Sequence, residues 1–371
     1  MGKNVKVGFL VSCWGDSGGA VRVAVNLANK MADDYEVHFL ELYGVGRSCA
    51  FSLDPRVLTK SLLEGESYRL SELVTKGRRP LRAYLSERRI DVMFLVGTYP
   101  GALSLMLGPM RRTKVVFCDH GAIANQLSDK QITLVRRIAP WLCAKTVSLT
   151  KRNEQDYQRI LHVPAARVTT IPNWIPSTLW ERETLYDVES KAAVWAGRLD
   201  PEKGFDHLLD IASKAQSALR RTGWRIDVYG ESVLSKGVDY SEEIVERGLE
   251  DVVVLKGSVD DLYERYPSYG ISLLTSYREG LPLVLLESQA CGLPSLSFDV
   301  VTGPSDIIVD GENGFLIEPF DCDAYARRLV QLVEDPLLRK RLAGRTRRVV
   351  EKFSEDAVYP QWTRLIEELV R

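Results

Sequence analysis

Short apolar runs alternate with segments of helical periodicity along this chain of 371 residues, and no other feature constrains the fold as strongly. In the first half, the apolar runs predict strands at residues 5–10, 36–41, 92–96, 114–118 and 146–149. The intervening segments repeat apolar residues every three or four positions and predict helices at 20–31, 67–89, 100–107, 129–142 and 151–160. Near-continuous apolar strands joined by crossover helices are typical of parallel sheets that are covered on both faces.

The second half repeats the alternation. It predicts strands at residues 193–196, 225–229, 252–255, 271–275, 295–298 and 315–317. It predicts helices at residues 205–218, 241–247, 282–290 and 324–333. Each half therefore has the pattern of a doubly wound, Rossmann-like α/β domain, and we expect two of them.

The boundary between the halves is marked by two prolines. Pro172 and Pro176 interrupt helix formation and stiffen the chain, and a polar segment follows them. We place a hinge near residues 172–191 and expect a cleft between the domains. The expected division is an N-terminal domain at 1–175, a C-terminal domain at 176–355, and a final helix within 356–371 that packs back on the first domain.

Composition excludes several classes of protein. The chain is 45% hydrophobic and 27% charged, which rules out disordered and collagen-like proteins. It lacks an apolar run long enough for a transmembrane helix, and no cleavage site follows the apolar stretch 5–13. The six cysteines are scattered without a Cys-x-x-Cys pair, so we expect neither disulfides nor zinc, and a cytoplasmic location.

A stretch that begins at Glu279 carries the strongest chemical signal. Pro282 suits the first turn of a helix and Gly292 suits its end. The preceding strand brings the chain to the carboxyl edge of a sheet, where α/β proteins bind ligands. The N–H groups around Leu283 would then be available to a phosphate, and Glu279 and Glu287 could reach the same cleft.

Two glycine-containing turns also follow predicted strands. In the first, Gly197 permits a tight turn, while Arg198 and Lys203 place two cations where a diphosphate would need them. The second turn contains Gly18 and Gly19, between the first strand and the first helix. It matches neither the dinucleotide pattern nor a Walker loop, but it would let the backbone approach a phosphate or a sugar.

Together these motifs resemble the retaining glycosyltransferases of family 4, which have the GT-B fold of two facing Rossmann-like domains with a cleft between them. The resemblance covers nearly the whole chain except residues 42–90, and it is greatest to enzymes of exopolysaccharide, capsule or O-antigen assembly. The matching segments are Gly18-Gly19, Gly197-Arg198, Lys203-Gly204, the pair Glu279…Glu287, Thr302–Asp306 and Asp310–Gly314.

The resemblance implies that the N-terminal domain binds the acceptor and the C-terminal domain binds the nucleotide-sugar donor, and it implies a role for each matched residue. Arg198 and Lys203 would neutralise the diphosphate of a nucleotide-sugar, Glu287 would hold the ribose hydroxyls, and Glu279 would hold hydroxyls of the transferred sugar. His120 resembles a histidine that contacts the donor sugar. The backbone N–H groups in the site would come from Gly280, Leu281 and Leu283.

The resemblance further implies transfer without a metal or other cofactor. The nucleotide-diphosphate sugar is the donor substrate, and UDP is favoured over GDP. One Asp-x-Asp sequence, Asp321 to Asp323, could instead indicate a metal-dependent enzyme, but it precedes a predicted helix, where Asp is a natural N-cap. We expect a retaining hexosyl transfer, assisted by the departing phosphate, to a glycan acceptor that is lipid-linked, with no nucleic acid as partner.

Other functions remain open on the same residues. A nucleotide-sugar epimerase or a sugar phosphorylase can share this fold, although phosphorylases are much longer chains. A non-catalytic subunit that binds a nucleotide-sugar is a further alternative. Loss of Arg198, Lys203 or either glutamate would favour it, and all four residues are present.

Charge is distributed unevenly between the halves. Residues 1–170 carry 25 Lys and Arg against 15 Asp and Glu, so their balance is +10, whereas the whole chain carries −1. One basic group lies at 76–89, and another, with Arg136 and Arg137, flanks an apolar stripe containing Val135 and Trp141. Such a stripe either packs in the core or binds an anionic membrane, which would make the protein peripheral on the inner face of the plasma membrane.

Overall fold

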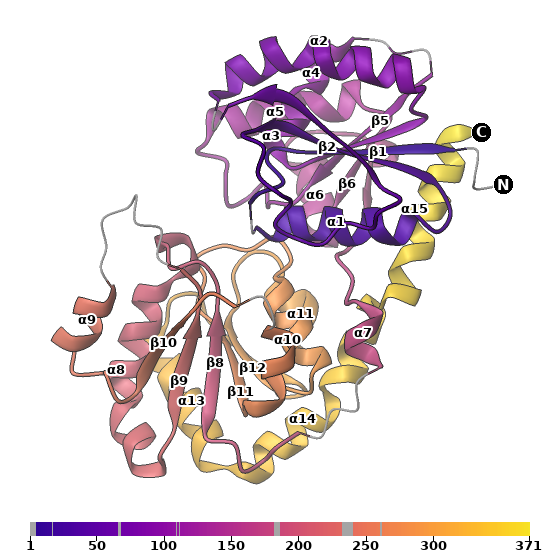
Figure 1. Ribbon diagram of the computed structural model, residues 1–371. Coiled ribbons are helices and arrows are strands. Elements are labelled where there is room, and N and C mark those ends of the chain that lie inside the picture. Colours follow the sequence, from indigo (N-terminus) through magenta and orange to yellow (C-terminus); the bar gives the residue numbers. More distant parts are fainter. Residues whose placement is uncertain are drawn as a thin grey trace. The chain divides into compact units, whose positions relative to one another are not determined.

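The computed structural model describes residues 5–16, 18–65, 68–108, 110, 112–181, 186–231, 240–259 and 262–371. The chain divides into two compact units. The N-terminal unit comprises Met1–Asn173 with Tyr359–Arg371, and the C-terminal unit comprises Trp174–Val358. Each has a parallel sheet with helices on both faces (Figure 1).

The N-terminal unit contains a seven-stranded parallel sheet in the order β3-β2-β1-β4-β5-β6-β7. Its strands are β1 (Lys6–Val11), β2 (Glu36–Gly44), β3 (Leu58–Glu64), β4 (Val92–Val96), β5 (Lys114–Asp119), β6 (Lys145–Ser148) and β7 (Val168–Thr170). Its helices are α1 (Gly19–Met31), α2 (Leu70–Arg88), α3 (Thr98–Ala102), α4 (Ser104–Leu107), α5 (Lys130–Leu142), α6 (Lys151–Arg159) and most of α15 (Glu355–Val370).

Alternate residues of the central strands form the two cores of this unit. Phe39 and Phe94 lie in register with Phe9 on either side, and Phe94 packs edge-on against Trp362 of α15 with ring centroids 5.4 Å apart. The intervening residues, such as Leu10, join the buried leucines of α2 on the other face. Period-2 packing on two apolar faces explains why these strands are apolar at every position.

The C-terminal unit contains a six-stranded parallel sheet in the order β10-β9-β8-β11-β12-β13. Its strands are β8 (Ala192–Ala196), β9 (Arg225–Tyr229), β10 (Val253–Gly257), β11 (Ile271–Leu274), β12 (Ser295–Phe298) and β13 (Gly314–Ile317). Its helices are α7 (Ser177–Trp180), α8 (Phe205–Thr222), α9 (Tyr240–Glu246), α10 (Leu262–Arg265), α11 (Leu283–Ala290), α12 (Pro304–Ile307), α13 (Cys322–Glu334) and α14 (Pro336–Val350).

The two faces of this second sheet have different side chains. Trp195 and Phe298 point into the core shared with α8 and α13. On the other face the strands carry the small, fully buried Ser272 and Ser295, and Gln289 of α11 donates a hydrogen bond to Ser295 Oγ at 3.0 Å. Small side chains leave room for α11 to approach the strands, and the buried amide fixes its position.

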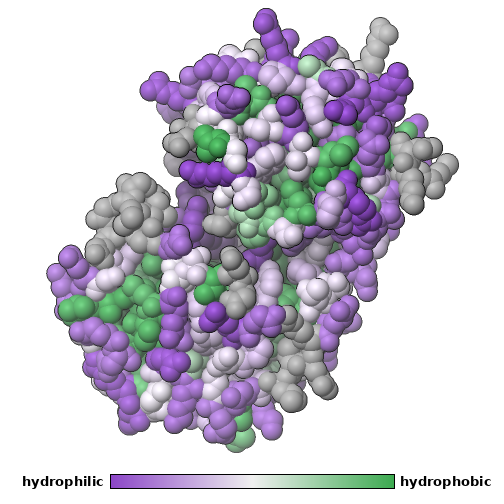
Figure 2. All heavy atoms as spheres, viewed as in Figure 1, coloured by the Kyte–Doolittle hydropathy of each residue, from purple (hydrophilic) through white to green (hydrophobic). Residues whose placement is uncertain are grey.

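The predicted doubly wound α/β class is confirmed. Each predicted strand is present within two residues at either end, except that β2 continues to Gly44, three residues past its predicted end. The edge strands β3 and β7 and the helices α7, α10, α12 and α14 were not predicted. Residue 67, the predicted start of α2, and Ser17 of the first glycine turn lie outside the described residues. Hydrophobic side chains also reach the surface, among largely hydrophilic ones (Figure 2).

None of the helices in the described parts of the chain combines the length and the apolar character needed to cross a bilayer. All six cysteines are free thiols.

Candidate functional site

The strand order of the C-terminal sheet indicates where on this unit a ligand would bind. Strand β8 pairs with β9 on one side and β11 on the other, so the strand order reverses there. Ligands bind α/β sheets at the carboxyl ends of the strands, beside such a reversal. Loop 197–204 follows β8 and loop 275–282 follows β11, and these loops carry most of the residues singled out in the sequence.

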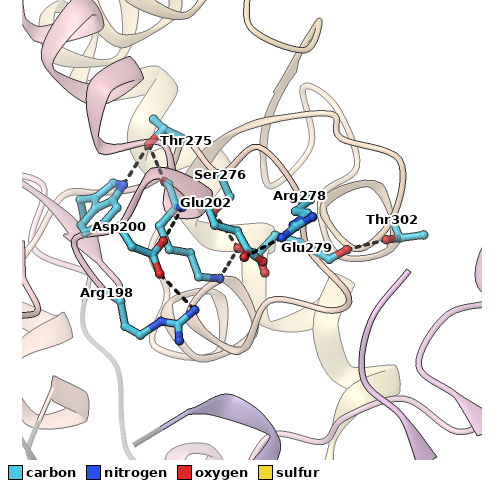
Figure 3. A network of polar contacts seen from close by, with 10 residues as sticks. Arg198, Asp200, Glu202, Thr275, Ser276, Arg278, Glu279 and Thr302 are labelled. Atoms are coloured by element: carbon cyan, nitrogen blue, oxygen red, sulfur yellow. Dashed lines mark hydrogen bonds and ion pairs between the residues drawn. The ribbon is translucent and has the colours of Figure 1, made fainter. Parts of the chain in front are cut away.

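Loops 197–204 and 275–282 are joined by short hydrogen bonds (Figure 3). Thr275 Oγ1 accepts a hydrogen bond from Trp195 Nε1 at 3.0 Å and donates to the carbonyl oxygen of Gly204 at 2.7 Å. A Cβ on Gly204 would lie 2.0 Å from the Thr275 carbonyl oxygen, and its φ is +66°. Only glycine fits this approach, which explains the Lys-Gly pair of the motif.

Lys203 and Glu279 meet across these loops. Lys203 Nζ lies 2.7 Å from Glu279 Oε1, and Ser276 Oγ donates to the same oxygen at 2.7 Å. The side chains of Lys203 and Glu279 are 26% and 8% exposed, so the ion pair is largely shielded from water but open on one side. The site thus places a cation and a carboxylate next to each other, in contact with one hydroxyl.

Arg198 is the more accessible cation of the site. Its guanidinium lies 3.2 Å from Asp200 and is 57% exposed, while Asp200 is buried and accepts a hydrogen bond from the Lys203 backbone N–H. Burial alone would raise the pKa of Glu202, but the Arg278 guanidinium at 2.9 Å, with help from Lys203, lowers it. Glu202 therefore stays ionised and compensates part of the local positive charge.

Glu287 lies on α11 and is buried. It is 2% exposed and accepts a hydrogen bond from Tyr263 Oη at 3.1 Å. Two residues further on, Gln289 exchanges hydrogen bonds with Asn313, which also donates to the carbonyl of Ile307. This buried network excludes a solvent-exposed role for Glu287 and holds its helix rigidly.

The start of α11 presents backbone N–H groups. Leu283 is its first residue, with Pro282 as the N-cap, and the first intrahelical bond runs from Leu286 N to Pro282 O. The N–H groups before Leu286 have no acceptor within the helix. Pro282 was expected inside the helix and lies one residue outside it, while Gly280 and Leu281 precede it in loop 275–282.

The loop after β12, which contains Thr302 and Gly303, packs against loop 275–282. Thr302, 1% exposed, donates from Oγ1 to the carbonyl oxygen of Glu279 at 2.6 Å. Gly303 has φ +98°, and a Cβ there would lie 2.6 Å from Pro282 and 2.9 Å from the Gly280 carbonyl oxygen. Thr302 and Gly303 therefore determine the path of the backbone that carries Glu279.

Gly18 and Gly19 lie at the carboxyl end of β1 in the N-terminal unit. Gly18 is the N-cap of α1 with ordinary extended dihedrals, and Gly19 is the exposed first residue of the helix. Behind this turn, Glu41 of β2 is buried and accepts a hydrogen bond from the Trp14 N–H at 3.2 Å. Burial raises the pKa of Glu41, a carboxyl group that the sequence motifs did not identify.

His120 directly follows β5 in the same unit. Burial lowers its pKa to about 4, although the Asp119 carboxylate acts in the opposite direction. Asp119 forms a buried two-bond ion pair with Arg136, at 2.8 and 2.9 Å, and accepts a hydrogen bond from Tyr157 Oη at 2.8 Å. It also accepts from the Gly121 N–H, so Asp119 fixes the turn that carries His120.

The predicted site residues thus fall into two groups. The C-terminal unit brings Lys203 into contact with Glu279 and also holds Gly197, Arg198, Gly280, Leu281, Leu283 and Glu287. The N-terminal unit holds Gly18, Gly19 and His120.

Sequence patterns missed Ser276, Thr302 and Tyr263 as contacts of the two glutamates. Thr302 begins the recognised segment Thr302–Asp306 and Ser276 lies three residues before Glu279, and these positions were the only signal for their contacts.

The Asp-x-Asp sequence has structural partners. Asp321 accepts a hydrogen bond from the Ala324 N–H as the N-cap of α13, and Asp323 pairs with Lys214 at 2.6 Å. The expected capping role of Asp321 is confirmed. Among the residues that the structure describes, no three His, Cys, Asp or Glu side chains are grouped so that they could hold a metal ion.

Comparisons with known protein families cover both units. Residues 17–179 match the model described as Glycosyltransferase Family 4, and residues 177–349 match the model described as Glycosyl transferases group 1. Together these two matches span nearly all of the chain.

Individual relatives agree with this result. An exopolysaccharide phosphotransferase of Streptomyces coelicolor is 28% identical over 99% of this chain, which spans only 41% of that relative's length. A Campylobacter jejuni enzyme named as an α-1,4-N-acetyl-D-galactosaminyltransferase acting on a diphospho-undecaprenol glycan is 25% identical, over 98% of this chain and 99% of its own.

A solved structure, a mutant of S. aureus TarM in complex with Fondaparinux, α-GlcNAc-glycerol and UDP, superposes with a TM-score of 0.82 at 15% identity. The superposition covers 98% of this chain and 99% of the other, which shows a shared fold. The chain therefore belongs to the glycosyltransferases of the GT-B fold, with a family 4 N-terminal domain and a group 1 C-terminal domain.

Proposed function

We propose that this glycosyltransferase moves a sugar from a UDP-sugar to a lipid-linked glycan acceptor, with retention of anomeric configuration, during assembly of a cell-surface polysaccharide. The observation that carries the proposal is the convergence of Arg198, Lys203 and the start of α11 at the strand reversal beside β8. Two cations and a helix N-terminus form a site for the diphosphate of a nucleotide-sugar.

The same groups account for the chemistry. Departure of the diphosphate leaves negative charge on the leaving oxygen, and preorganised cations and N–H groups stabilise that charge. The bond between the anomeric carbon and the phosphate oxygen breaks, and the acceptor oxygen bonds to that carbon on the same face. The acceptor hydroxyl proton passes to the departing phosphate, so no protein nucleophile is required.

The carboxylates orient the donor. Glu279, held by Lys203 and Ser276, accepts hydrogen bonds from hydroxyls of the transferred sugar, and Glu287 accepts them from the ribose. Buried acceptors of fixed position discriminate strongly against ligands that lack the matching hydroxyl. His120, on the N-terminal unit, carries a neutral imidazole at physiological pH, because burial keeps its pKa low.

The choice of donor and acceptor is supported by the related proteins. The TarM structure was solved with UDP, and the name of the Campylobacter relative specifies a glycan on a diphospho-undecaprenol carrier. Metal independence is part of the proposal: Arg198 and Lys203 supply the positive charge, and the Asp-x-Asp carboxylates already cap α13 and bind Lys214.

Peripheral binding to an anionic membrane is the remaining part of the proposal, and the structure corrects its residues. Arg136 and Val135, placed on the basic stripe from the sequence, are buried, since Arg136 pairs with Asp119. Leu134, Trp141 and Leu142 of the predicted stripe are each about half exposed on α5, with the exposed Arg137 beside them. Exposed Trp and Leu next to basic residues suit the interface of an anionic bilayer.

Calorimetric titration of the chain with a panel of nucleotides and nucleotide-sugars tests the donor assignment. UDP and one UDP-sugar should bind, and Arg198→Ala should weaken both. Binding of the panel with no preference for any diphosphate, or tight binding unaffected by Arg198→Ala, would overturn it.

A further inference from the structure

Three aromatic rings form an exposed group on the C-terminal unit, here called the aromatic patch: His207 of α8, Tyr277 of loop 275–282, and Phe320 after β13. Ring centroids lie 4.3 Å apart for His207 and Tyr277, 5.1 Å for Tyr277 and Phe320, and 5.3 Å for His207 and Phe320. The rings are tilted by only 35–37° to one another. Tyr277 and Phe320 are 38% and 45% exposed, so the patch presents flat apolar area to solvent.

The backbone of Phe320 indicates that its exposed ring is not simply the edge of the hydrophobic core. Phe320 has φ +69°, a left-handed conformation that suits glycine and strains a bulky L-residue. The turn that contains it needs no side chain there, because Asp321 N bonds to Glu318 O and the Asp321 side chain caps α13. The strain is therefore borne by a residue whose ring lies on the surface, over the buried Phe298.

The aromatic patch is continuous with the candidate site. Tyr277 lies two residues before Glu279 in the same loop, and its backbone N–H donates to the Glu202 carbonyl oxygen at 3.0 Å. Its hydroxyl donates to Asp206 Oδ2 at 2.6 Å, which fixes the ring. A chain bound across the patch would thus lie beside the loop that carries Glu279.

Charge around the aromatic patch restricts what can bind there. Glu318, Asp321 and Asp323 are exposed next to Phe320, and Asp206 and Asp210 lie on the first turns of α8. Lys214 pairs with Asp323, Arg247 with Asp210 and Arg278 with Glu202, so these charges compensate one another, and Arg327 lies near Asp323. Asp206, Glu318 and Asp321 outnumber Arg327 and leave the surroundings of the patch acidic. Carboxylates repel phosphates and anionic lipids but accept hydrogen bonds from hydroxyls, and aromatic faces pack against the C–H faces of sugar rings.

We propose that the aromatic patch binds a neutral saccharide chain, namely sugar units of the glycan that lie beyond the reacting one. The proposal rests on the proposed function only in taking that chain to be the acceptor or product of transfer. No phosphate or nucleotide contact is involved, so the patch and the donor site can be tested separately.

Saturation-transfer NMR on the full chain, without donor, is the test, with maltotetraose, cellotetraose and chitotetraose as probes. At least one tetrasaccharide should receive saturation on its ring C–H protons. Tyr277→Ala and Phe320→Gly should each weaken its binding by about fivefold or more, the loss expected for one aromatic contact. Leu337→Ala removes an exposed apolar side chain from α14 of the same unit and should leave binding unchanged.

Phe320→Gly is the more informative variant, because relief of the left-handed backbone offsets part of the packing that is lost with the ring. No saturation of any tetrasaccharide, or equal binding by Phe320→Gly, would overturn the proposal. A dimer abolished by Phe320→Gly without any change in saccharide binding would also overturn it and make the patch an interface between copies. UDP binding that fails while saccharide binding persists would count against the donor site alone.

Discussion

The single residue Lys203 links the positive and negative charges of the candidate site, because it pairs with Glu279. Its ammonium lies against Glu279 and orders the carboxylate, and in the proposed function it also adds positive charge for a leaving group. Lys203→Ala should lower turnover about 100- to 1000-fold, the usual cost of removing one preorganised donor to a developing anion. The measurement is steady-state release of the nucleoside diphosphate.

Lys214→Ala is the matched control, because Lys214 also forms a lysine–carboxylate pair in the C-terminal unit but lies outside the site. It should retain near wild-type turnover. Turnover above about half of wild type in Lys203→Ala would contradict the assigned role.

Thr302 tests whether backbone position matters as much as charge. Thr302→Val keeps the shape but removes the donor to the Glu279 carbonyl, which costs about 1 kcal/mol and should lower turnover about fivefold. Thr302→Ser restores the hydroxyl and should recover most of the rate. If Val and Ser variants have the same turnover, the hydrogen bond does not position Glu279.

His120 makes the N-terminal unit sensitive to acid. Its pKa is about 4 in the folded chain and 6.5 in the reference state, so below pH 6.5 the unfolded chain binds a proton that the folded chain does not. Stability should therefore fall as pH drops from 6.5 to 4, by up to roughly 3 kcal/mol from this group. Urea denaturation of wild type and His120→Asn should show a shallower pH dependence for the variant, and identical slopes would refute the assignment.

Individual residues were predictable only where a local motif contains them. Glu279 and Lys203 were found because their spacing belongs to motifs, yet their ion pair was not, since it depends on β8 and β11 being neighbours. Arg136 was misplaced on a surface because periodicity cannot show that Asp119, seventeen positions earlier, pairs with it in the interior. Partners distant in sequence are set by the fold.

Among the helices and strands, the extent of burial determined which ones could be predicted from the sequence. The central strands are buried on both faces and are apolar throughout, so their positions were predicted closely. β3 is an edge strand with exposed Lys60 and Glu64, and β7 has three residues, so neither has an apolar run. α14 carries six Lys and Arg among fifteen residues, which obscured its narrow buried stripe.

Helix α5 carries the element-scale prediction. Its exposed Trp141 and Leu142 should insert at an anionic interface, so the chain should float with phosphatidylglycerol vesicles at low salt and dissociate as salt rises. Replacing both residues with serine should abolish flotation. Leu337→Ser, which removes a leucine that is 78% exposed on α14, should not. Equal absence of wild type from anionic and neutral vesicles would remove the membrane proposal.

For the whole molecule, the distribution of the candidate site residues over two units follows from two parallel sheets with similar strand order. Each reverses its strand order beside a central strand, β1 in one unit and β8 in the other, so each unit offers one binding edge. The cations and glutamates lie at the edge of the C-terminal unit, and the glycine turn and His120 at that of the N-terminal unit. This organisation could be predicted because it depends on the order of elements rather than on particular contacts.

Positive charge from the protein predicts how the whole enzyme responds to chelators. Activity should survive EDTA, and added Mg²⁺ or Mn²⁺ should change it little, because Arg198 and Lys203 supply the positive charge in the proposed function. Loss of activity with EDTA and recovery with Mn²⁺ would contradict metal independence, and Asp321→Asn with Asp323→Asn would then identify the ligands.

The stereochemistry of transfer tests the central claim most directly. The purified chain would be incubated with UDP-sugars and a lipid-linked glycan acceptor, and the anomeric proton coupling of the new linkage would be followed by NMR before any mutarotation. The account predicts stoichiometric release of UDP and a product with the anomeric configuration of the donor. An inverted linkage, or consumption of the UDP-sugar without a new glycosidic bond, would contradict it.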